Sequence, residues 1–317
     1  MKALPVTFTP YFKKVVWGGD KICRFKRIPQ PFSNIGESWE ISGLPGHETL
    51  VDSGPYKGWT ISRLIKEFDK DFLGEKVKKK YNNIFPLLIK IIDAKENLSV
   101  QVHPDDDLAK KRHNSLGKTE MWYILQSDPD AKIFAGLKNK ITPDNFQEKI
   151  NGDFIENLSC YNSQSGDVFF LPSGQVHAIG SGNLLIEIQE SSDITYRIYD
   201  YNRLDSNGEK RELHTSFAKD AIDYDTSFVC KLPTDSINNS EIVNCSHFSI
   251  SKFEIKGKKN LKLDPLSFEI LICLEGKAEL SYKEGNSQIY CGNTVLFPAC
   301  MEEIEMNGKG KFLKCKV

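Results

Sequence analysis

Short runs of apolar residues alternate with turn residues along most of this chain, and this pattern predicts β-strands. Residues 84–103 hold two apolar runs separated by Lys95-Glu96-Asn97, which is typical of a turn. Further strands, each bounded by Gly, Pro, Asp or Asn, are expected over residues 120–125, 131–135, 166–171, 184–189, 248–255, 268–274, 278–283 and 294–298. Many short strands at close spacing favour a sandwich or jelly roll over a doubly wound sheet.

Helices are expected to be few. The clearest one begins after Thr60, a suitable N-cap, and its apolar residues recur at the helical spacing: Ile61, Leu64, Ile65 and Phe68. Thr142-Pro143 predicts the start of a second helix, because proline is tolerated in the first helical turn. A third helix is expected after Pro104.

The chain divides into two parts by composition. The polar stretch 233–244 has the composition of a linker, so we expect a domain of residues 1–232 and a second of residues 233–317. A weak repeat crosses this boundary: Gly166-x5-Pro172 is echoed by Gly292-x5-Pro298, and residues 120–125 are loosely echoed by 269–274. Two related β-units would explain the repeat, and chance similarity between short strands is the alternative.

Charge and length narrow the class of protein. The 317 residues allow one to three domains, and 42 Lys+Arg against 43 Asp+Glu give a net charge of −1. A nucleic-acid-binding protein would normally carry a basic excess, so we expect none as a partner. An anionic ligand would need local cations, because the overall field is close to zero.

The sequence favours a soluble, cytoplasmic protein with reduced thiols. No apolar run approaches the ~20 residues that cross a bilayer, and the first residues contain no apolar stretch of signal-peptide length. The eight cysteines include no C-x-x-C pair, which leaves neither a zinc knuckle nor a redox motif.

Several polar residues are predicted on strand faces that would otherwise fill a small barrel. Because alternate side chains of a strand share a face, Gln101 and His103 should point together, away from Leu98, Val100 and Val102. The same alternation groups Lys118, Glu120 and Trp122. His177 follows the tight turn of Gly166-x5-Pro172-x-Gly174-x2-His177.

Gln101, His103, Glu120 and His177 together offer an amide oxygen, two imidazoles and a carboxylate. That donor set suits zinc in a catalytic site, where water or substrate completes the coordination. Each residue alone has an ordinary explanation, as a core or surface histidine or a solvent-facing glutamate. The combination is what indicates a metal site.

The motifs resemble those of a known protein superfamily and of one family within it. The Gly166–His177 pattern is similar to the second metal motif of the cupin superfamily. Residues 85–106 (FPLLIKIIDAKENLSVQVHPDD) resemble the hallmark of class I mannose-6-phosphate isomerases, as do four shorter motifs: Trp17-Gly-Gly19, Gly36-Glu-Ser-Trp39, Gly117-Lys-Thr-Glu120 and Tyr196-Arg197. The resemblance covers roughly residues 5–225, and the length is similar to that of the short bacterial form of the family.

The resemblance implies a mainly β fold of cupin jelly-roll modules with one zinc ion per chain. By motif, the metal ligands are Gln101, His103, Glu120 and His177. The general cupin pattern has H-x-H with a nearby glutamate; the isomerase family shares the departure seen here, Gln101-Val-His103 with a distant Glu120. In the second copy Cys300 and Glu303 replace Gly174 and His177, so residues 233–317 are expected to form a metal-free, degenerate cupin-like domain with a packing or oligomer role.

The implied reaction is the reversible interconversion of mannose 6-phosphate and fructose 6-phosphate through an enediol, with a small phosphosugar as substrate. By motif the catalytic residues are Arg197, Lys118 and Glu187. Arg197 either stabilises negative charge or pairs with Asp193 or Asp200. Lys118 takes part in proton transfer or is a surface partner of Glu120, and Glu187 is a rival base or a supporting residue.

Several alternatives stay open at this point. The polar stretch of Arg203, Lys210, Arg211 and His214 reaches the phosphate or is a solvated loop. Two histidines and one carboxylate also describe a non-haem Fe(II) oxygenase, although Gln101 would fill one of the open metal positions that such an enzyme needs. A cupin that binds sugar phosphate without catalysis is the third reading, and the sequence leaves a homo-oligomer open.

Overall fold

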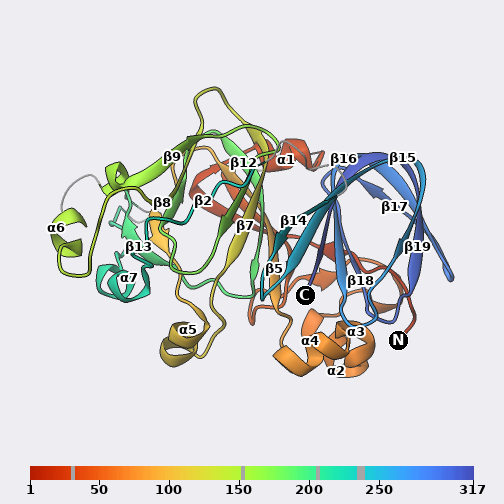
Figure 1. Ribbon diagram of the computed structural model, residues 1–317. Helices are drawn as coiled ribbons and strands as arrows, with labels where there is room; N and C mark the ends of the chain where they lie inside the picture. Colours follow the sequence, from red (N-terminus) through yellow and green to blue (C-terminus); the bar gives the residue numbers. More distant parts are fainter. Residues whose placement is uncertain (30–32, 151–153, 205–207, 234–239) are drawn as a thin grey trace.

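The computed structural model describes residues 1–29, 33–150, 154–204, 208–233 and 240–317. Figure 1 shows two β-rich units side by side, with short helices along their margins. The strands within each sheet pair antiparallel, as a jelly roll requires. The predicted mainly β, cupin-like fold is therefore confirmed.

The first unit contains two larger sheets and one small one. The first large sheet has the order β10-β7-β12-β5-β3-β2, made of Val168–Leu171, Glu120–Ser127, Asn183–Glu190, Leu87–Ala94, Ile35–Ser42 and Tyr11–Gly19. The second has the order β13-β6-β11-β8-β9, made of Tyr196–Tyr199, Val100–Val102, His177–Ile179, Lys132–Leu137 and Leu158–Asn162. The short strands β1 (Phe8–Thr9) and β4 (Leu50–Val51) pair separately.

The second unit is one curved sheet, whose long strands lie at the right of Figure 1. Its order is β14-β15-β19-β16-β17, with β18 also paired to β16: Ser240–Asn244, Ser249–Lys262, Glu303–Lys316, Glu269–Tyr282, Gly285–Tyr290 and Thr294–Phe297. The expectation of a linker through residue 244 is wrong at its end, because residues 240–244 form β14 and pair with β15. Residues 234–239 lie outside the described residues.

The internal repeat is present in the structure. Strand β10 pairs with β7 so that Leu171 lies opposite Glu120, and β18 pairs with β16 so that Phe297 lies opposite Glu269. Leu171 and Phe297 hold the same position in the two Gly-x5-Pro motifs. The division into domains of residues 1–232 and 233–317 stays a prediction.

Two of the three predicted helices begin where the sequence places them. Thr60 caps α2 (Ile61–Phe68) by accepting the Arg63 N–H at 3.2 Å, and Asp105 caps α5 (Asp106–His113) by accepting the Leu108 N–H at 2.8 Å. The other helices are α1 (Lys21–Phe25), α3 (Lys70–Leu73), α4 (Glu75–Tyr81), α6 (Phe146–Ile150) and α7 (Thr215–Ala221), with 3₁₀ turns at Gly54–Tyr56 and Phe154–Asn157.

The helix predicted from Thr142 begins later than expected. It starts only at Phe146, as α6. Before it, the Asn145 side chain accepts the Thr142 N–H at 2.8 Å, and Thr142 Oγ1 accepts the Asn145 N–H at 3.4 Å. These two side chains therefore form a turn that precedes the helix.

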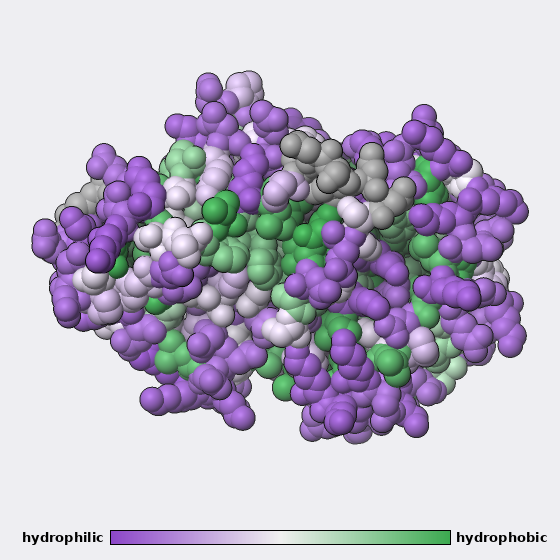
Figure 2. All heavy atoms as spheres, in the orientation of Figure 1, coloured by the Kyte–Doolittle hydropathy of each residue, from purple (hydrophilic) through white to green (hydrophobic). Residues whose placement is uncertain are grey.

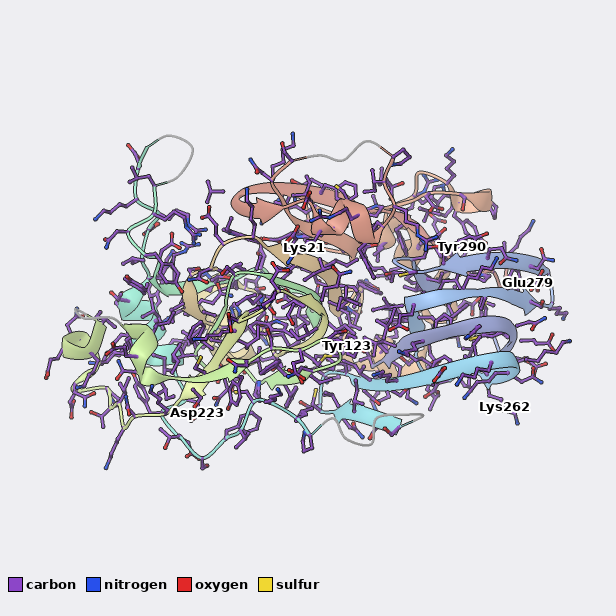
Figure 3. All side chains as sticks on the ribbon, turned by 90° about the horizontal axis from the view of Figure 1, so that it is seen from above. Lys21, Tyr123, Asp223, Lys262, Glu279 and Tyr290 are labelled. Atoms are coloured by element: carbon purple, nitrogen blue, oxygen red, sulfur yellow. The ribbon has the colours of Figure 1, made fainter. Side chains whose placement is uncertain are left out.

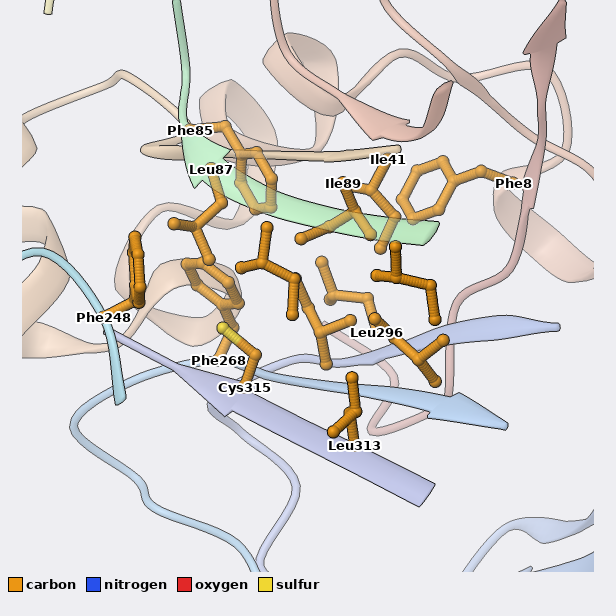
Figure 4. Close-up of a cluster of buried hydrophobic side chains, with 14 of the residues drawn as sticks. Phe8, Ile41, Phe85, Leu87, Ile89, Phe248, Phe268, Leu296, Leu313 and Cys315 are labelled. Carbon is orange, nitrogen blue, oxygen red and sulfur yellow. The ribbon is translucent and has the colours of Figure 1, made fainter. Parts of the chain in front are cut away.

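The two units share one apolar core. Strands β3 and β5 of the first unit pack against β16, β18 and β19 of the second, together with helices α2 to α4. Figure 4 shows the centre of this cluster: Phe8, Ile41, Phe85, Leu87, Ile89, Phe248, Phe268, Leu296, Leu313 and Cys315. Tyr123 on β7 lies where the units meet (Figure 3), with Lys252 Nζ 5.1 Å from its ring centre.

The outer surface is mainly polar. Figure 2 shows hydrophilic side chains over most of this face and hydrophobic atoms chiefly in the middle, where the two units meet. No helix among the described residues has the length and apolar character needed to cross a membrane. The eight cysteines, all of which lie within the described residues, form no disulfide bond.

Candidate metal centre and active site

The two larger sheets of the first unit bring two rows of polar side chains into the interior. In one row Arg197, Gln101 and His177 lie directly opposite one another on β13, β6 and β11. In the other row, on the facing sheet, Lys90, Glu187 and Trp122 lie opposite one another on β5, β12 and β7. Directly opposed residues of antiparallel strands share a face, so each row presents its side chains together.

Three of the predicted metal ligands, His103, Glu120 and His177, lie close together at this place. His103 and His177 are each 1% exposed and Glu120 is 0% exposed. Glu120 Oε1 lies 3.2 Å from His177 Nε2, and Glu120 Oε2 lies 3.5 Å from His103 Nε2. The fourth predicted ligand, Gln101, is half-buried with its Nε2 at 3.3 Å from His177 Nε2.

The donor atoms suit a metal ion. His103 Nδ1 bonds the Ile194 carbonyl at 2.8 Å and His177 Nδ1 bonds the Gln175 carbonyl at 2.9 Å, which leaves each Nε2 as the free ligand atom. Glu120 Oε1 is buried and has no hydrogen-bond partner among the described residues. A buried carboxylate with one unbonded oxygen, beside two imidazole nitrogens, is a donor set that metal ions take, so these residues fit the implied metal.

The predicted turn places His177 at the start of its strand. Gly174 has φ of +90°, and its N–H donates to the His103 carbonyl at 2.9 Å. A Cβ here would lie 3.1 Å from the Asp223 nitrogen. Glycine is therefore required both by the backbone conformation and by the close approach of the neighbouring chain.

Burial sets the protonation of the ligand group. Burial, with a further contribution from Lys118, lowers the pKa of His177 to about 3 and also lowers that of His103. Burial raises the pKa of Glu120 to about 7, although Lys118 acts in the opposite direction. Both imidazoles are thus neutral near pH 7, which is the form that binds metal.

The raised pKa of Glu120 predicts a proton-linked metal affinity. Below about pH 7 the metal-free Glu120 carboxyl is protonated, so metal binding must displace that proton. We expect the affinity for a divalent metal to fall about tenfold for each pH unit below 7 and to level off above it. Titration against a chromophoric chelator between pH 5 and 8 measures this slope. An affinity that is independent of pH over this range would contradict the prediction.

Lys118 lies inside the site rather than on the surface. It is 3% exposed, with Nζ 3.0 Å from His103 Nε2 and in contact with the Glu120 carboxylate. Its backbone segment is held from both sides, because Asp106 accepts the Gly117 N–H and Glu190 accepts the Thr119 N–H, each at 2.8 Å. The pairing of Lys118 with Glu120 is confirmed, and the surface location is wrong.

Glu187 is held by two donors. Its Oε1 accepts from Lys90 Nζ at 3.0 Å and its Oε2 accepts from Trp122 Nε1 at 2.9 Å. Burial alone would raise the pKa of Glu187, but the charges of Lys118 and Lys90 with these hydrogen bonds lower it to about 2. The carboxylate is therefore a stable anion at neutral pH.

Lys90 and Glu37 are site residues that the sequence analysis missed. Lys90 Nζ lies 4.0 Å from Glu37 Oε2, and that oxygen also accepts from Trp39 Nε1 at 2.7 Å. The sequence contains a feature that could have identified Lys90, because this charged residue lies inside the otherwise apolar run LLIKII. A buried charge in a strand with eight buried residues calls for a partner.

Arg197 lies on the edge strand β13, directly opposite Gln101. Its Nη1 donates to the Glu212 carbonyl at 2.8 Å, and its backbone N–H donates to His214 Nδ1 at 3.2 Å. Nε is buried without a hydrogen-bond partner among the described residues. Burial lowers the pKa of Arg197, and the positive charge of Arg211 lowers it further.

The polar stretch after Arg197 forms an ion-pair cluster. In the described part of the chain Asp200 pairs with Arg203 at 2.6 Å and with Arg211 at 2.5 Å, whereas Lys210 is exposed and bonds Asn202. The predicted pairing of Asp200 with Arg197 is not the arrangement found. Arg203 and Arg211 are fixed on Asp200 rather than free in a solvated loop.

A metal-ligand group inside a jelly roll defines the cupin class. Within that class, the chain belongs to the type I phosphomannose isomerase family: the catalytic-domain model of that family matches residues 6–153 and the mannose-6-phosphate isomerase cupin-domain model matches residues 238–317. The first match contains Gln101, His103, Lys118 and Glu120, whereas His177, Glu187 and Arg197 lie between the two.

Full-length relatives agree with this assignment. A mannose-6-phosphate isomerase of Bacillus subtilis is 34% identical over 97% of both chains, and one of Streptococcus mutans is 31% identical over 96% of both. The crystal structure of the Bacillus subtilis mannose 6-phosphate isomerase superposes with a TM-score of 0.87 at 33% identity over 99% of both chains. An Archaeoglobus fulgidus structure, at 21% identity and a TM-score of 0.82, shares the fold.

Proposed function

We propose that this protein is a zinc-dependent isomerase that interconverts mannose 6-phosphate and fructose 6-phosphate through an enediol. The observation that carries the proposal is the buried Glu120 carboxylate, which contacts His103, His177 and Lys118 in a chain of this family. Gln101, His103, Glu120 and His177 would hold the ion, and their nitrogen and oxygen donors are those that zinc takes in catalytic sites. When bound, zinc would supply a Lewis acid for the sugar oxygens.

Lys118 is the better candidate for proton transfer. The reaction moves a proton between C1 and C2, and an efficient base has a pKa near the working pH. A pKa near 2 makes Glu187 a weak base. Lys118 lies against two metal ligands and so can reach the atoms of a sugar bound there. Glu187 then serves to position Lys90 and Trp122.

Arg197 is assigned to charge stabilisation. The proposal is supported by the register, because Arg197 lies directly opposite Gln101 and its side chain therefore leaves the same face of the sheet, and by its Nε, which has no partner among the described residues. A fixed cation at this place stabilises the enediolate as negative charge develops. The presence of Lys118, Glu187 and Arg197 around the ligands supports an isomerase over a silent sugar-binding cupin or an oxygenase.

The same proposal includes a cellular location and a role for the second unit. The lack of disulfide bonds among the described cysteines supports a cytoplasmic location, where thiols stay reduced. In the second unit Cys300 and Glu303 line a hollow of about 590 Å³ at the place where the first unit has its ligand turn. This supports a degenerate, metal-free module for residues 233–317, and a homo-oligomer remains a prediction.

A coupled assay in deuterated water tests the proposed function. Mannose 6-phosphate should be converted to fructose 6-phosphate, and a base-mediated transfer through an enediol should introduce some solvent deuterium at C1 or C2. Glucose 6-phosphate serves as the control substrate. Absence of turnover with the zinc-loaded protein would refute the assignment, and turnover without any deuterium would refute proton exchange with solvent.

A further inference from the structure

A second cluster of metal-ligand side chains lies outside the proposed active site. Asp106 at the start of α5, Glu190 at the end of β12 and His247 in the turn between β14 and β15 each offer one ligand atom, and these atoms lie within 4.8 Å of one another. The first two belong to the catalytic unit and His247 belongs to the C-terminal unit. None of the three takes part in the mechanism proposed above.

The central carboxylate of this cluster is buried and incompletely bonded. Glu190 is 1% exposed, and its Oε2 accepts the Thr119 N–H. Its Oε1 lies 2.8 Å from His247 Nδ1, yet neither atom forms a hydrogen bond of acceptable geometry among the described residues. Glu120 Oε1 in the active site shows the same feature: it is buried, unbonded and close to an imidazole nitrogen.

Negative charge accumulates at this place. Burial raises the pKa of Tyr81, and the nearby Glu190 and Asp106 carboxylates raise it further. The neighbouring Lys80 donates to the Ser246 carbonyl at 2.5 Å rather than to either carboxylate. Two carboxylates and one imidazole therefore gather, and in the described part of the chain no lysine or arginine forms an ion pair with either carboxylate. Carboxylate oxygens and imidazole nitrogens are zinc ligands.

We propose that Asp106, Glu190 and His247 form a second divalent-cation site of the zinc type, which joins the catalytic unit to the C-terminal unit. Asp106 is exposed, so the site is open to solvent and to water as a further ligand. Asp106 and Glu190 also hold the Gly117 and Thr119 N–H groups on either side of Lys118. The second ion thus lies behind the segment that carries Lys118 into the active site.

Metal analysis after equilibrium dialysis against zinc at pH 7.5 tests this site. We expect two zinc ions per chain in the wild-type protein and one in His247→Gln. Asp106→Asn, a conservative change at an exposed position, is the second variant and should also reduce the count or the affinity. His47→Gln is the matched control, because His47 is an exposed histidine that packs against Tyr11 and Trp39, and it should retain both ions.

The active-site variant Glu120→Gln separates the two sites. The Glu120→Gln protein should retain one zinc ion, and added zinc should still raise its melting temperature. The double variant Glu120→Gln/His247→Gln should bind no zinc, and zinc should leave its melting temperature unchanged. A wild-type count of one zinc, lost in Glu120→Gln and unchanged in His247→Gln, would overturn the second site and leave a simple His247–Glu190 ion pair. Two ions that neither His247→Gln nor Asp106→Asn affects would overturn its location. Because the count is independent of turnover, failure here leaves the isomerase proposal intact.

Discussion

His177→Gln is expected to lose one zinc ion per chain and to lower kcat for mannose 6-phosphate by about a thousandfold. The His177 Nε2 atom lies 3.2 Å from Glu120 Oε1 in a fully buried site, so no surface residue can replace it as a ligand. A bound metal contributes several kcal/mol of transition-state stabilisation, and ~1.4 kcal/mol corresponds to tenfold in rate. The coupled assay and metal analysis of the same sample measure both effects.

Two controls accompany this variant. Wild-type protein stripped by a chelator should lose activity to the same extent and recover it when zinc is added, whereas His177→Gln should not recover. Cys160→Ser, a change at an exposed thiol, should keep both zinc and activity. A His177→Gln protein that retains its full zinc content, or one that turns over normally without the ion, would refute the ligand assignment.

Lys118→Met is expected to reduce kcat by about 10²- to 10⁴-fold, the usual range for a proton-transfer group. The substitution keeps the approximate length of a side chain that is 3% exposed but removes the amino group that contacts His103 and Glu120. Zinc content should persist, because the three buried ligands remain. The rate of deuterium incorporation into the sugar should fall together with kcat.

The comparison with Glu187→Gln decides between the two candidate bases. If Lys118 transfers the proton, Glu187→Gln should have the smaller effect on deuterium exchange, because glutamine keeps the side-chain shape and its amide oxygen can still accept from one of the two donors, Lys90 or Trp122. Lys110→Met, at an exposed position on α5, is the matched lysine control and should leave turnover unchanged. Deuterium exchange that persists in Lys118→Met and disappears in Glu187→Gln would reverse the assignment.

The alternation of side chains along a strand was enough to predict, from local sequence alone, which strand faces carry the proposed metal ligands. Val100 and Val102 pack on the face of β6 away from Gln101, and Lys118 and Trp122 reach the same site as Glu120. Leu98 does not join Val100 and Val102: it belongs to a different hydrophobic cluster, the one that contains Trp122. Strict alternation applies only within a strand, and Leu98 precedes the first residue of β6.

Other features depended on long-range contacts that local sequence does not encode. Strand β19 (Glu303–Lys316) carries lysines and glycines and was not predicted, yet it lies between β15 and β16. A Cβ at Gly308 would lie 2.3 Å from the Lys277 carbonyl of β16, so this glycine serves the close approach of the neighbouring strand. The cluster of Asp106, Glu190 and His247 was missed for the same reason, since its members are distant in sequence.

The apolar core shared by the two β-units has a consequence for dilute solution. Two separate cupin-like modules would dissociate as the protein concentration falls, because their association would be bimolecular. Here strands β3 and β5 meet β16, β18 and β19 within one chain, so the contact is intramolecular and its strength does not depend on concentration. The proposed metal ligands Gln101, His103, Glu120 and His177 likewise come from a single chain, which allows the site to persist at concentrations where a subunit interface would be lost.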